Sequence, residues 1–330
     1  MQYYRINKEE WDRTLEQLMS SYIIFATLNN EFGLDYEELT SDNIAEISYN
    51  LPKPSTPLKN FFLPVKENVT SGREYSRKRI IIGIPNCDIT ALKILDEIYL
   101  DEDFPDIFYR EKRENTVLIA SDCFGIQEHC HCTSYGVKPW SDSVADLAVV
   151  KKDNTIILRV ISQKGEEFLS QLSLVTPLND SDIVAEIEKE QINTESLLKD
   201  KNKFLPDYST TGKLVSGAGE EIWKKYSSTC VSCGACATIC PTCTCFILID
   251  KEGFEKVKQL DACQYPGFAR VAGGEDPLAE LHRRFRNRYM CKYVWKPMRF
   301  ASLACTGCGR CIEACIGKIN KNKLFTELAG

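Results

Sequence analysis

The first 200 residues alternate between short apolar runs and segments with helical periodicity. Residues 79–84 (RIIIGI) and 116–120 (TVLIA) are almost wholly apolar, as strands buried on both faces of a sheet are. Apolar residues recur at helical spacing over residues 8–20 and again over residues 88–100, where Asp88 is the expected N-cap. Strands that alternate with helices are typical of a sheet covered by helices.

Further elements extend the same pattern. Strands are expected at residues 22–28, 146–150 and 155–161, and a polar helix around residues 183–198. The second and third of these strands are joined by a Lys-Asp-Asn turn. We therefore predict an α/β domain over residues 1–205.

Proline and glycine interrupt the pattern after this domain. Residues 203–219 contain Pro206 and three glycines, and we place a linker at residues 206–219. The Ser-Gly-Ala-Gly stretch at residues 216–219 follows no buried strand, so it is interpreted as linker and not as a dinucleotide-binding loop.

Two cysteine runs with the same C-x2-C-x2-C-x3-C spacing follow. They are Cys230, Cys233, Cys236 and Cys240, and then Cys305, Cys308, Cys311 and Cys315. Three closely spaced thiolates bind three corners of one iron–sulfur cube, and the fourth cysteine ligates the cube of the other run. We expect two [4Fe-4S] clusters, one on Cys230, Cys233, Cys236 and Cys315 and the other on Cys305, Cys308, Cys311 and Cys240.

The spacing predicts an α+β, bacterial-ferredoxin-like two-cluster domain over residues 220–330, with a long insertion at residues 241–304. Structural zinc is the main alternative, but zinc ligands come as two separated pairs and do not require triplets. The first run ends in Cys-Pro, as the ferredoxin pattern does, whereas the second ends in Cys315-Ile316.

A second group of cysteines lies in the N-terminal domain: Cys87, Cys123, Cys130 and Cys132. Each comes just after a predicted buried strand or in the loop that follows one. Because adjacent parallel strands end at the same edge of a sheet, these loops are expected to meet there. A third [4Fe-4S] cluster is one interpretation, with His129 or His131 as substitute ligands, and buried free thiols are the other.

Four cysteines remain, namely Cys243, Cys245, Cys263 and Cys291. They either bind a further cluster or pack around the clusters already described, where neighbouring groups tune the potential. The sequence leaves both interpretations open.

Composition narrows the class of protein. The chain has 330 residues, 43% of them hydrophobic, and contains no apolar run long enough to cross a membrane. Its first residues are polar, which predicts a cytoplasmic protein without a signal peptide. In that compartment 16 cysteines indicate metal binding and not disulfides. The formal net charge of −6 argues against nucleic acid as a partner.

One basic and aromatic segment, residues 283–296 (RRFRNRYMCKYVWK), runs against the overall acidity. Such a segment can stack on single-stranded nucleic acid. We prefer a solvated helix face, or a segment that offsets cluster charge and docks an acidic partner. Two neighbouring clusters indicate a protein that transfers single electrons. Because the sequence contains no nucleotide-binding motif, we expect the electron donor and the electron acceptor on other subunits. No catalytic residue is assigned.

Over nearly its whole length the chain resembles the dicluster iron–sulfur subunits of two complexes, the beta subunit of NAD(P)-linked nickel–iron sulfhydrogenases and the corresponding subunit of anaerobic sulfite reductase. The resemblance rests on Cys87-Asp88-Ile89, Leu92-Lys93-Ile94-Leu95-Asp96, Cys123 with Cys130-x-Cys132, Cys240-Pro241-Thr242-Cys243-x-Cys245, Asp261-Ala262-Cys263-Gln264, Ala272-Gly273-Gly274 and Arg284-Phe285-Arg286-Asn287-Arg288-Tyr289. The segments Tyr99-Leu100-Asp101 and Cys291-Lys292 are more similar to the sulfhydrogenase side. The chain departs from the pattern at His131, where an aromatic is usual, at Ile316, where proline is, and in its short segment before Cys230.

The resemblance implies a subunit of a hetero-oligomer. It would relay electrons between a flavoprotein that carries FAD and handles NAD(P)H and a catalytic metalloenzyme subunit, which is a nickel–iron sulfhydrogenase or, alternatively, a sulfite reductase. Two hypotheses of another class are a stand-alone iron–sulfur enzyme, with a catalytic cluster on the N-terminal cysteines, and an iron–sulfur sensor.

Overall fold

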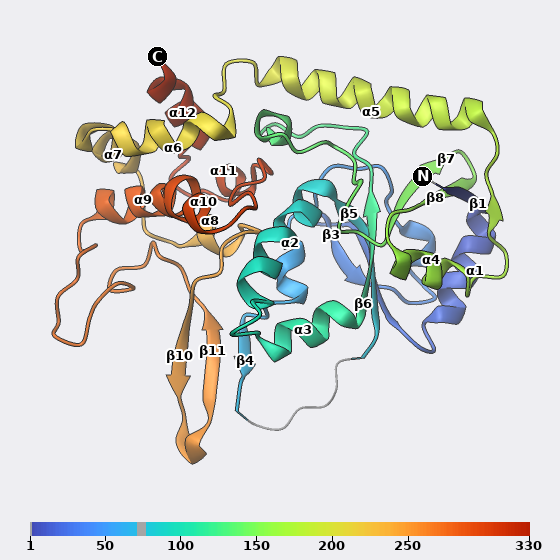
Figure 1. Cartoon of the computed structure of the whole chain (residues 1–330), viewed down its shortest axis with the longest axis horizontal. Helices are drawn as coiled ribbons and strands as arrows, with labels where there is room; N and C mark the ends of the chain where they lie inside the picture. The colour runs from blue at the N-terminus through green and yellow to red at the C-terminus, as the bar shows by residue number, and fades with distance from the viewer. Residues whose placement is uncertain (1, 71–76) are drawn as a thin grey trace.

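A large mixed sheet forms the centre of the first 200 residues (Figure 1). The computed structural model describes residues 2–70 and 77–330, and in this part of the chain the sheet has eight strands in the order β3-β2-β5-β6-β7-β8-β1-β9. Their bounds are β1 Tyr3–Asn7, β2 Ile23–Asn30, β3 Gly33–Glu38, β5 Arg79–Pro85, β6 Thr116–Ser121, β7 Leu147–Lys152, β8 Thr155–Val160 and β9 Thr176–Pro177. Strands β2, β5, β6 and β7 are parallel, and the remaining pairs are antiparallel.

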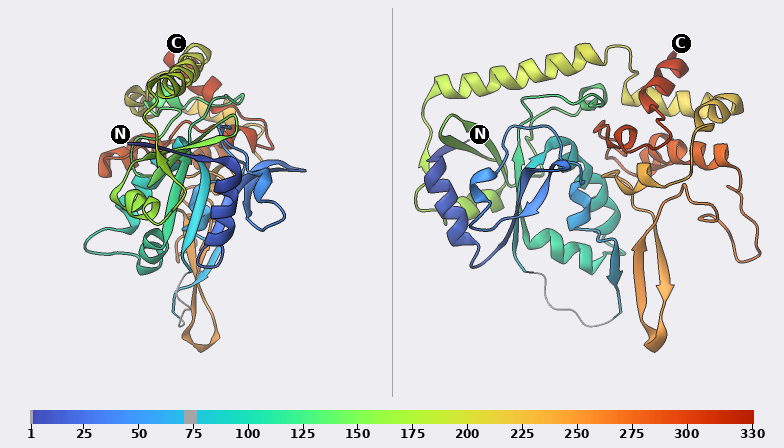
Figure 2. Two further views of the ribbon diagram at one scale, coloured as in Figure 1. Left: turned by 90° about the vertical axis from the view of Figure 1, so that its right-hand side faces the viewer. Right: turned by 180° about the vertical axis from the view of Figure 1, so that it is seen from behind.

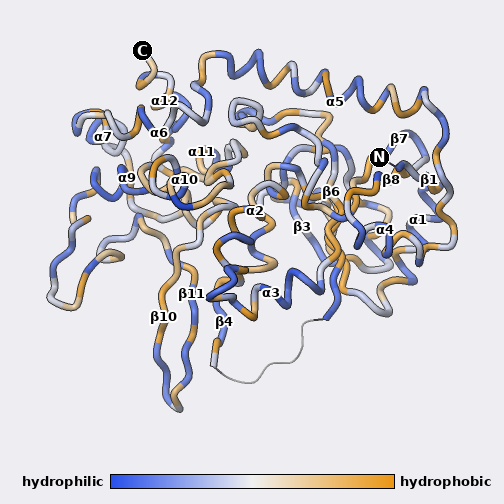
Figure 3. Tube along the Cα trace, viewed as in Figure 1, coloured by the Kyte–Doolittle hydropathy of each residue, from blue (hydrophilic) through white to orange (hydrophobic). Residues whose placement is uncertain are grey.

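Helices cover both faces of this sheet (Figures 1 and 2). Helices α1 (Lys8–Leu18) and α4 (Gln163–Leu169) pack on one face, and α2 (Asn86–Tyr99) and α3 (Ile107–Glu114) pack on the other. Side chains alternate along β5, so Ile80 contributes to the first core and Ile81 to the second. Because both faces are covered, the middles of β5 and β6 are apolar, which Figure 3 shows as the orange centre of the sheet.

Most of the predicted elements of this unit are confirmed, and one detail is wrong. Helix α2 begins at Asn86, directly after β5, and its N-cap is Pro85. Asp88, the expected cap, lies inside the first turn and is fully buried. Its carboxylate instead forms an ion pair with Arg310, which belongs to the other end of the chain.

The segment expected to be a linker is helical, which corrects the prediction for residues 206–219. Helix α5 (Ser181–Lys201) crosses the molecule, and α6 (Tyr208–Gly217) follows after a short turn (Figure 1). Gly212 lies inside α6, where it allows close packing against the helical segment around Tyr293. A Cβ at this position would lie 2.6 Å from the Tyr293 carbonyl oxygen, so only glycine lets the two helical segments approach this closely.

The C-terminal unit is mostly helical. After α6 come α7 Glu220–Ser227, α8 Ala235–Thr238, α9 Leu281–Met290, the π-helical turn η5 Cys291–Trp295, α10 Lys296–Arg299, α11 Arg310–Glu313 and α12 Lys321–Ala329. Short helices α8 and α11 each begin within a cysteine run, and they pack against one another. Aromatic side chains fill the core around them, among them Trp223, Tyr289 and, from the first unit, Tyr135.

The insertion at residues 241–304 contains a hairpin that projects from the body of the molecule (Figure 2). Strands β10 (Phe246–Asp250) and β11 (Lys256–Leu260) form it, and β4 (Lys66–Asn68) from the first unit pairs with β11. Four short 3-10 turns complete the described elements, η1 Ile44–Glu46, η2 Leu58–Phe61, η3 Cys132–Tyr135 and η4 Glu252–Phe254. Within residues 2–70 and 77–330, no helix is both long and apolar enough to span a membrane.

Candidate metal centres

The four N-terminal cysteines line one cavity. Strands β5 and β6 are parallel neighbours, so Cys87, just after β5, and Cys123, just after β6, emerge at the same edge of the sheet. Cys130 and Cys132 line the same cavity from the following loop. The structure therefore brings together the four residues that the sequence pointed to.

His131, in the same loop, has both of its ring nitrogens engaged in hydrogen bonds. His131 is buried, and its Nδ1–H donates to the His129 carbonyl oxygen at 2.8 Å. Its Nε2 accepts a hydrogen bond from the Lys321 ammonium at 2.7 Å. Burial and the Lys321 charge hold the pKa of His131 well below its ordinary value, so the ring is neutral. With both nitrogens engaged, His131 is not arranged to replace a cysteine ligand.

The loop that carries Cys130 and Cys132 packs directly on the second cysteine run. The His131 N–H donates to the Gly307 carbonyl oxygen at 2.9 Å. Cys308, the next residue, lines the N-terminal cavity together with the four N-terminal cysteines. The N-terminal cavity and the second run are thus immediate neighbours.

A buried ion pair fastens the same two loops together. The Arg310 guanidinium contacts both carboxylate oxygens of Asp88, at 2.6 and 2.8 Å, and the side chains are 1% and 0% exposed. Arg310 also donates to the Pro54 carbonyl oxygen at 2.9 Å. Because Asp88 follows Cys87 and Arg310 lies two residues after Cys308, the pair fixes one cysteine loop against the other.

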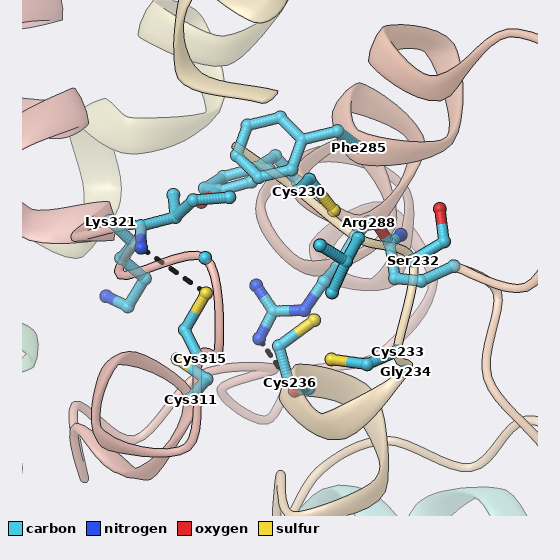
Figure 4. A pocket seen from close by; sticks show the side chains of 15 residues that line it. Cys230, Ser232, Cys233, Gly234, Cys236, Phe285, Arg288, Cys311, Cys315 and Lys321 are labelled. Carbon is cyan, nitrogen blue, oxygen red and sulfur yellow. Dashed lines mark hydrogen bonds between the residues drawn. The ribbon is translucent and has the colours of Figure 1, made fainter. Parts of the chain in front are cut away.

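A second cavity gathers the cysteines that were expected on the first cluster. Cys230, Cys233, Cys236 and Cys315 all line it (Figure 4). Their sulfur atoms face this space, and the Arg288 side chain reaches toward it (Figure 4). The Cys315 sulfur accepts a hydrogen bond from the Ile319 N–H at 3.3 Å, a contact of the kind that tunes cluster potentials.

The remaining expected quartet lies between these two cavities. The charge of Cys308 interacts with those of Cys240 and Cys311, and Cys305 interacts with Lys292, which is also close to Cys240. Cys311 lines the cavity of the first quartet as well. The second quartet thus contacts the first through Cys311 and the N-terminal one through Cys308.

The thiols are too widely spaced for a mononuclear site. In a tetrahedral zinc site with Zn–S bonds of 2.3 Å, the sulfurs lie about 3.8 Å apart. Among the described residues, no three cysteine sulfurs lie within 4.8 Å of one another; the one such group of ligand atoms belongs to Glu220, Glu280 and His282 at the surface. A cluster separates its thiolates further, because iron and sulfide stand between them, and this wider spacing is the one that the cysteines show.

Buried cations surround the cysteines, and this charge distribution fits thiolate ligands. Lys59, Arg288, Lys292 and Lys321 are each at most 4% exposed. In the part of the chain that the structure describes, none of the four forms an ion pair with a carboxylate. Burial opposes the charge of Lys292, but Cys240 and Cys243 raise its pKa well above the ordinary value. Buried lysine and arginine are rare without a counter-charge, and metal-bound thiolates at the neighbouring cysteines would supply it.

Burial acts in the opposite direction on the thiols. It raises the pKa of Cys236 to about 11 and that of Cys308 to about 12, so without a metal these thiols stay protonated at neutral pH. Metal binding supplies the compensation that lets a buried cysteine ionise.

Comparison with known proteins agrees with this geometry. Residues 229–319 match the model of a family described as a 4Fe-4S dicluster domain. This part of the chain is thus similar to dicluster iron–sulfur domains. It is also similar to the beta subunit of sulfhydrogenase 2 from Pyrococcus furiosus, with 28% identity over 344 aligned positions that cover 99% of this chain and 98% of that protein.

Several residues around the dicluster domain could not be found from the sequence. The basic segment at residues 283–296 was expected to be a solvated face or to offset cluster charge, and the burial of Arg284, Arg288 and Lys292 favours the second interpretation. Lys59 and Lys321 lie outside the cysteine runs in the sequence. Only the tertiary structure brings them to the clusters.

Proposed function

We propose that this protein is the iron–sulfur electron-transfer subunit of a hydrogenase-type complex. It would pass electrons between a flavoprotein that uses NAD(P)H and a catalytic nickel–iron sulfhydrogenase subunit. In this role Cys230, Cys233, Cys236 and Cys315 hold one [4Fe-4S] cluster, and Cys305, Cys308, Cys311 and Cys240 hold a second. Cys87, Cys123, Cys130 and Cys132 hold a third. The similarity to a sulfhydrogenase beta subunit over the full length supports the type of complex.

The observation that carries the proposal is the continuity of the three cysteine sites. Cys311 belongs to the second quartet and lines the cavity of the first, while Cys308 belongs to the second quartet and lines the N-terminal cavity. Neighbouring clusters held in this way form a path along which single electrons pass. A reaction centre would need only one such site and an open coordination position.

The path has an exposed end at the first quartet. Cys233 is exposed, and the apolar side chains of Val231 and Ile316 beside the cavity are 61% and 65% exposed. Exposed apolar side chains next to a redox centre suit the contact with a partner subunit, across which an electron enters or leaves.

Replacing Cys236 with alanine tests the relay. The anaerobically purified complex that contains this chain is expected to reduce NAD(P)+ with H2. The variant is expected to lose about four iron atoms per chain and at least about 90% of this activity, because one cluster of the path is missing. Reduction of a viologen dye by H2 at the catalytic subunit should be unchanged, since the dye takes electrons before the relay.

Thr229→Ser is the matched control, because it lies beside Cys230 and keeps the hydroxyl that donates to the Gly317 carbonyl oxygen at 2.8 Å. It should retain full iron and full activity. The proposal is wrong if the Cys236 variant still reduces NAD(P)+ with H2, or if the wild type contains zinc in place of iron. Either result would show that electrons do not pass through this chain.

The charge of Arg288 is expected to set the potential of the first cluster. Its guanidinium donates to the Cys236 carbonyl oxygen at 3.0 Å and interacts with the Cys236 and Cys311 thiolates. A nearby cation stabilises the more negative, reduced cluster, so Arg288→Met should lower the potential by on the order of 60 mV, a tenfold change in the one-electron equilibrium. A redox titration followed by electron paramagnetic resonance measures the shift.

Arg283→Met controls for the loss of an arginine from the same helix. The Arg283 side chain is 57% exposed and lies 3.8 Å from the Glu280 carboxylate, so water already screens its charge. Its removal should leave the potential within about 10 mV of the wild type. Equal shifts in the two variants would contradict a specific role for Arg288.

A further inference from the structure

The structure gathers the four cysteines that the three sites leave over. Cys245 directly precedes β10, and Cys263 comes shortly after β11. These strands pair in antiparallel register with Phe246 opposite Leu260, and the Asp261 N–H donates to the Cys245 carbonyl oxygen at 2.9 Å. The base of the hairpin therefore brings two cysteines that are 18 positions apart in the sequence close together.

The other two cysteines approach from either side of this pair. The Cys243 thiol interacts with that of Cys263. Cys291 begins the π-helical turn η5, and the next residue, Lys292, donates to the Thr242 hydroxyl at 2.7 Å, which places this turn beside the segment that carries Cys243. A π-helical turn redirects side chains within a helix and is frequent at functional sites.

The polar surroundings repeat those of the dicluster domain. The Lys59 ammonium lies 3.2 Å from the Cys243 carbonyl oxygen, and the Lys296 ammonium lies 2.8 Å from the Thr242 carbonyl oxygen. Neither lysine pairs with a carboxylate among the described residues. The Gln264 amide donates to the Cys263 sulfur at 3.7 Å. Two lysines and one hydrogen-bond donor therefore surround these cysteines, and neither lysine has a carboxylate partner in the described part of the chain. Such surroundings stabilise negatively charged thiolates.

We propose that Cys243, Cys245, Cys263 and Cys291 bind a fourth iron–sulfur cluster. No three of their sulfurs lie within 4.8 Å of one another, so the four thiols leave the wider spacing that a polynuclear group needs. The site adjoins the second quartet, because the Cys243 N–H donates to the Cys240 carbonyl oxygen at 3.3 Å. A cluster at this site would extend the electron-transfer path toward the projecting hairpin. With this fourth site, all 16 cysteines are assigned to four groups of four.

The test compares metal content in the anaerobically purified full-length protein. The double variant Cys245→Ala/Cys263→Ala is expected to lose about four iron and four sulfide ions per chain relative to the wild type, with the other clusters retained. Thr244→Ser, in the same loop and without a thiol, should keep the full amount. Iron, labile sulfide and zinc are counted on the same samples, and far-UV circular dichroism reports the fold.

Cys291→Ala provides a second test from a different segment, which does not disturb the base of the hairpin. It should lose between about one and four iron atoms, since a cube that lacks one thiolate sheds an iron or falls apart. Unchanged iron in Cys291→Ala, or loss of a single zinc in either variant, overturns the fourth cluster. Neither result affects the relay through Cys236, which the H2-dependent assay tests separately.

Discussion

Replacing Arg310 with methionine is expected to lower the free energy of unfolding by about 3–5 kcal/mol, the cost of leaving one partner of a buried ion pair unpaired. The remaining Asp88 carboxylate is fully buried, and the Leu58 N–H, at 3.3 Å, would still donate to it. The pair also holds the Cys87 loop against the Cys308 loop, so iron should be lost from the N-terminal and second quartets. Urea denaturation under anaerobic conditions measures the first effect, and iron counting measures the second.

Two further variants separate the ion pair from a general loss of arginine. Arg283→Met removes an exposed charge and should cost less than about 1 kcal/mol. The double variant Arg310→Met/Asp88→Leu removes both buried charges and should recover part of the stability, because no charge is left without a partner. A single variant as stable as Arg283→Met would show that the pair does not fasten the two units.

Replacing Gly307 with alanine should separate the N-terminal cavity from the second cysteine run. The added Cβ would lie 2.5 Å from the His131 carbonyl oxygen and 2.7 Å from the Cys132 nitrogen, both backbone atoms that cannot move aside. The backbone at Gly307 also has φ of 70°, which costs an alanine about 1–2 kcal/mol. We expect a total loss of at least about 3 kcal/mol and the release of about four iron atoms from the N-terminal quartet.

Gly253→Ala is the control variant, because it introduces the backbone strain of a positive φ without a steric clash. Gly253 has φ of 76°, but no atom lies within 4 Å of the position that its Cβ would occupy. Its substitution should cost about 1–2 kcal/mol and no iron. If both variants lose the same stability and both keep their iron, the close approach of the two loops is unimportant for the N-terminal site.

Local patterns in the sequence were sufficient to predict most of the helices and strands of the N-terminal domain. The apolar runs at residues 79–84 and 116–120 are each typical of a strand that is buried on both faces of a sheet. Two such strands are expected near one another in the middle of the sheet. Their parallel pairing then placed Cys87 and Cys123 at one edge. The repeated spacing of the two runs predicted the dicluster domain, because cluster geometry dictates that spacing.

Features that depend on distant residues could not be predicted. Gly212 read as a helix breaker because its packing partner, Tyr293, lies 81 positions away in the sequence. Asp88 read as a helix cap because local propensity gives no sign of Arg310. Strand β4 has only three residues and acquires its partner from β11 across the molecule. In each case a tertiary contact outweighs the local preference.

The interleaving of the two ends of the chain has a consequence for biogenesis. The N-terminal cavity takes Cys308 as part of its lining, and the first cavity depends on Cys315. On a ribosome, the earliest cysteines are therefore exposed without their lining until almost the entire polypeptide has emerged. Neither cavity can therefore close before the C-terminal cysteine run has been synthesised.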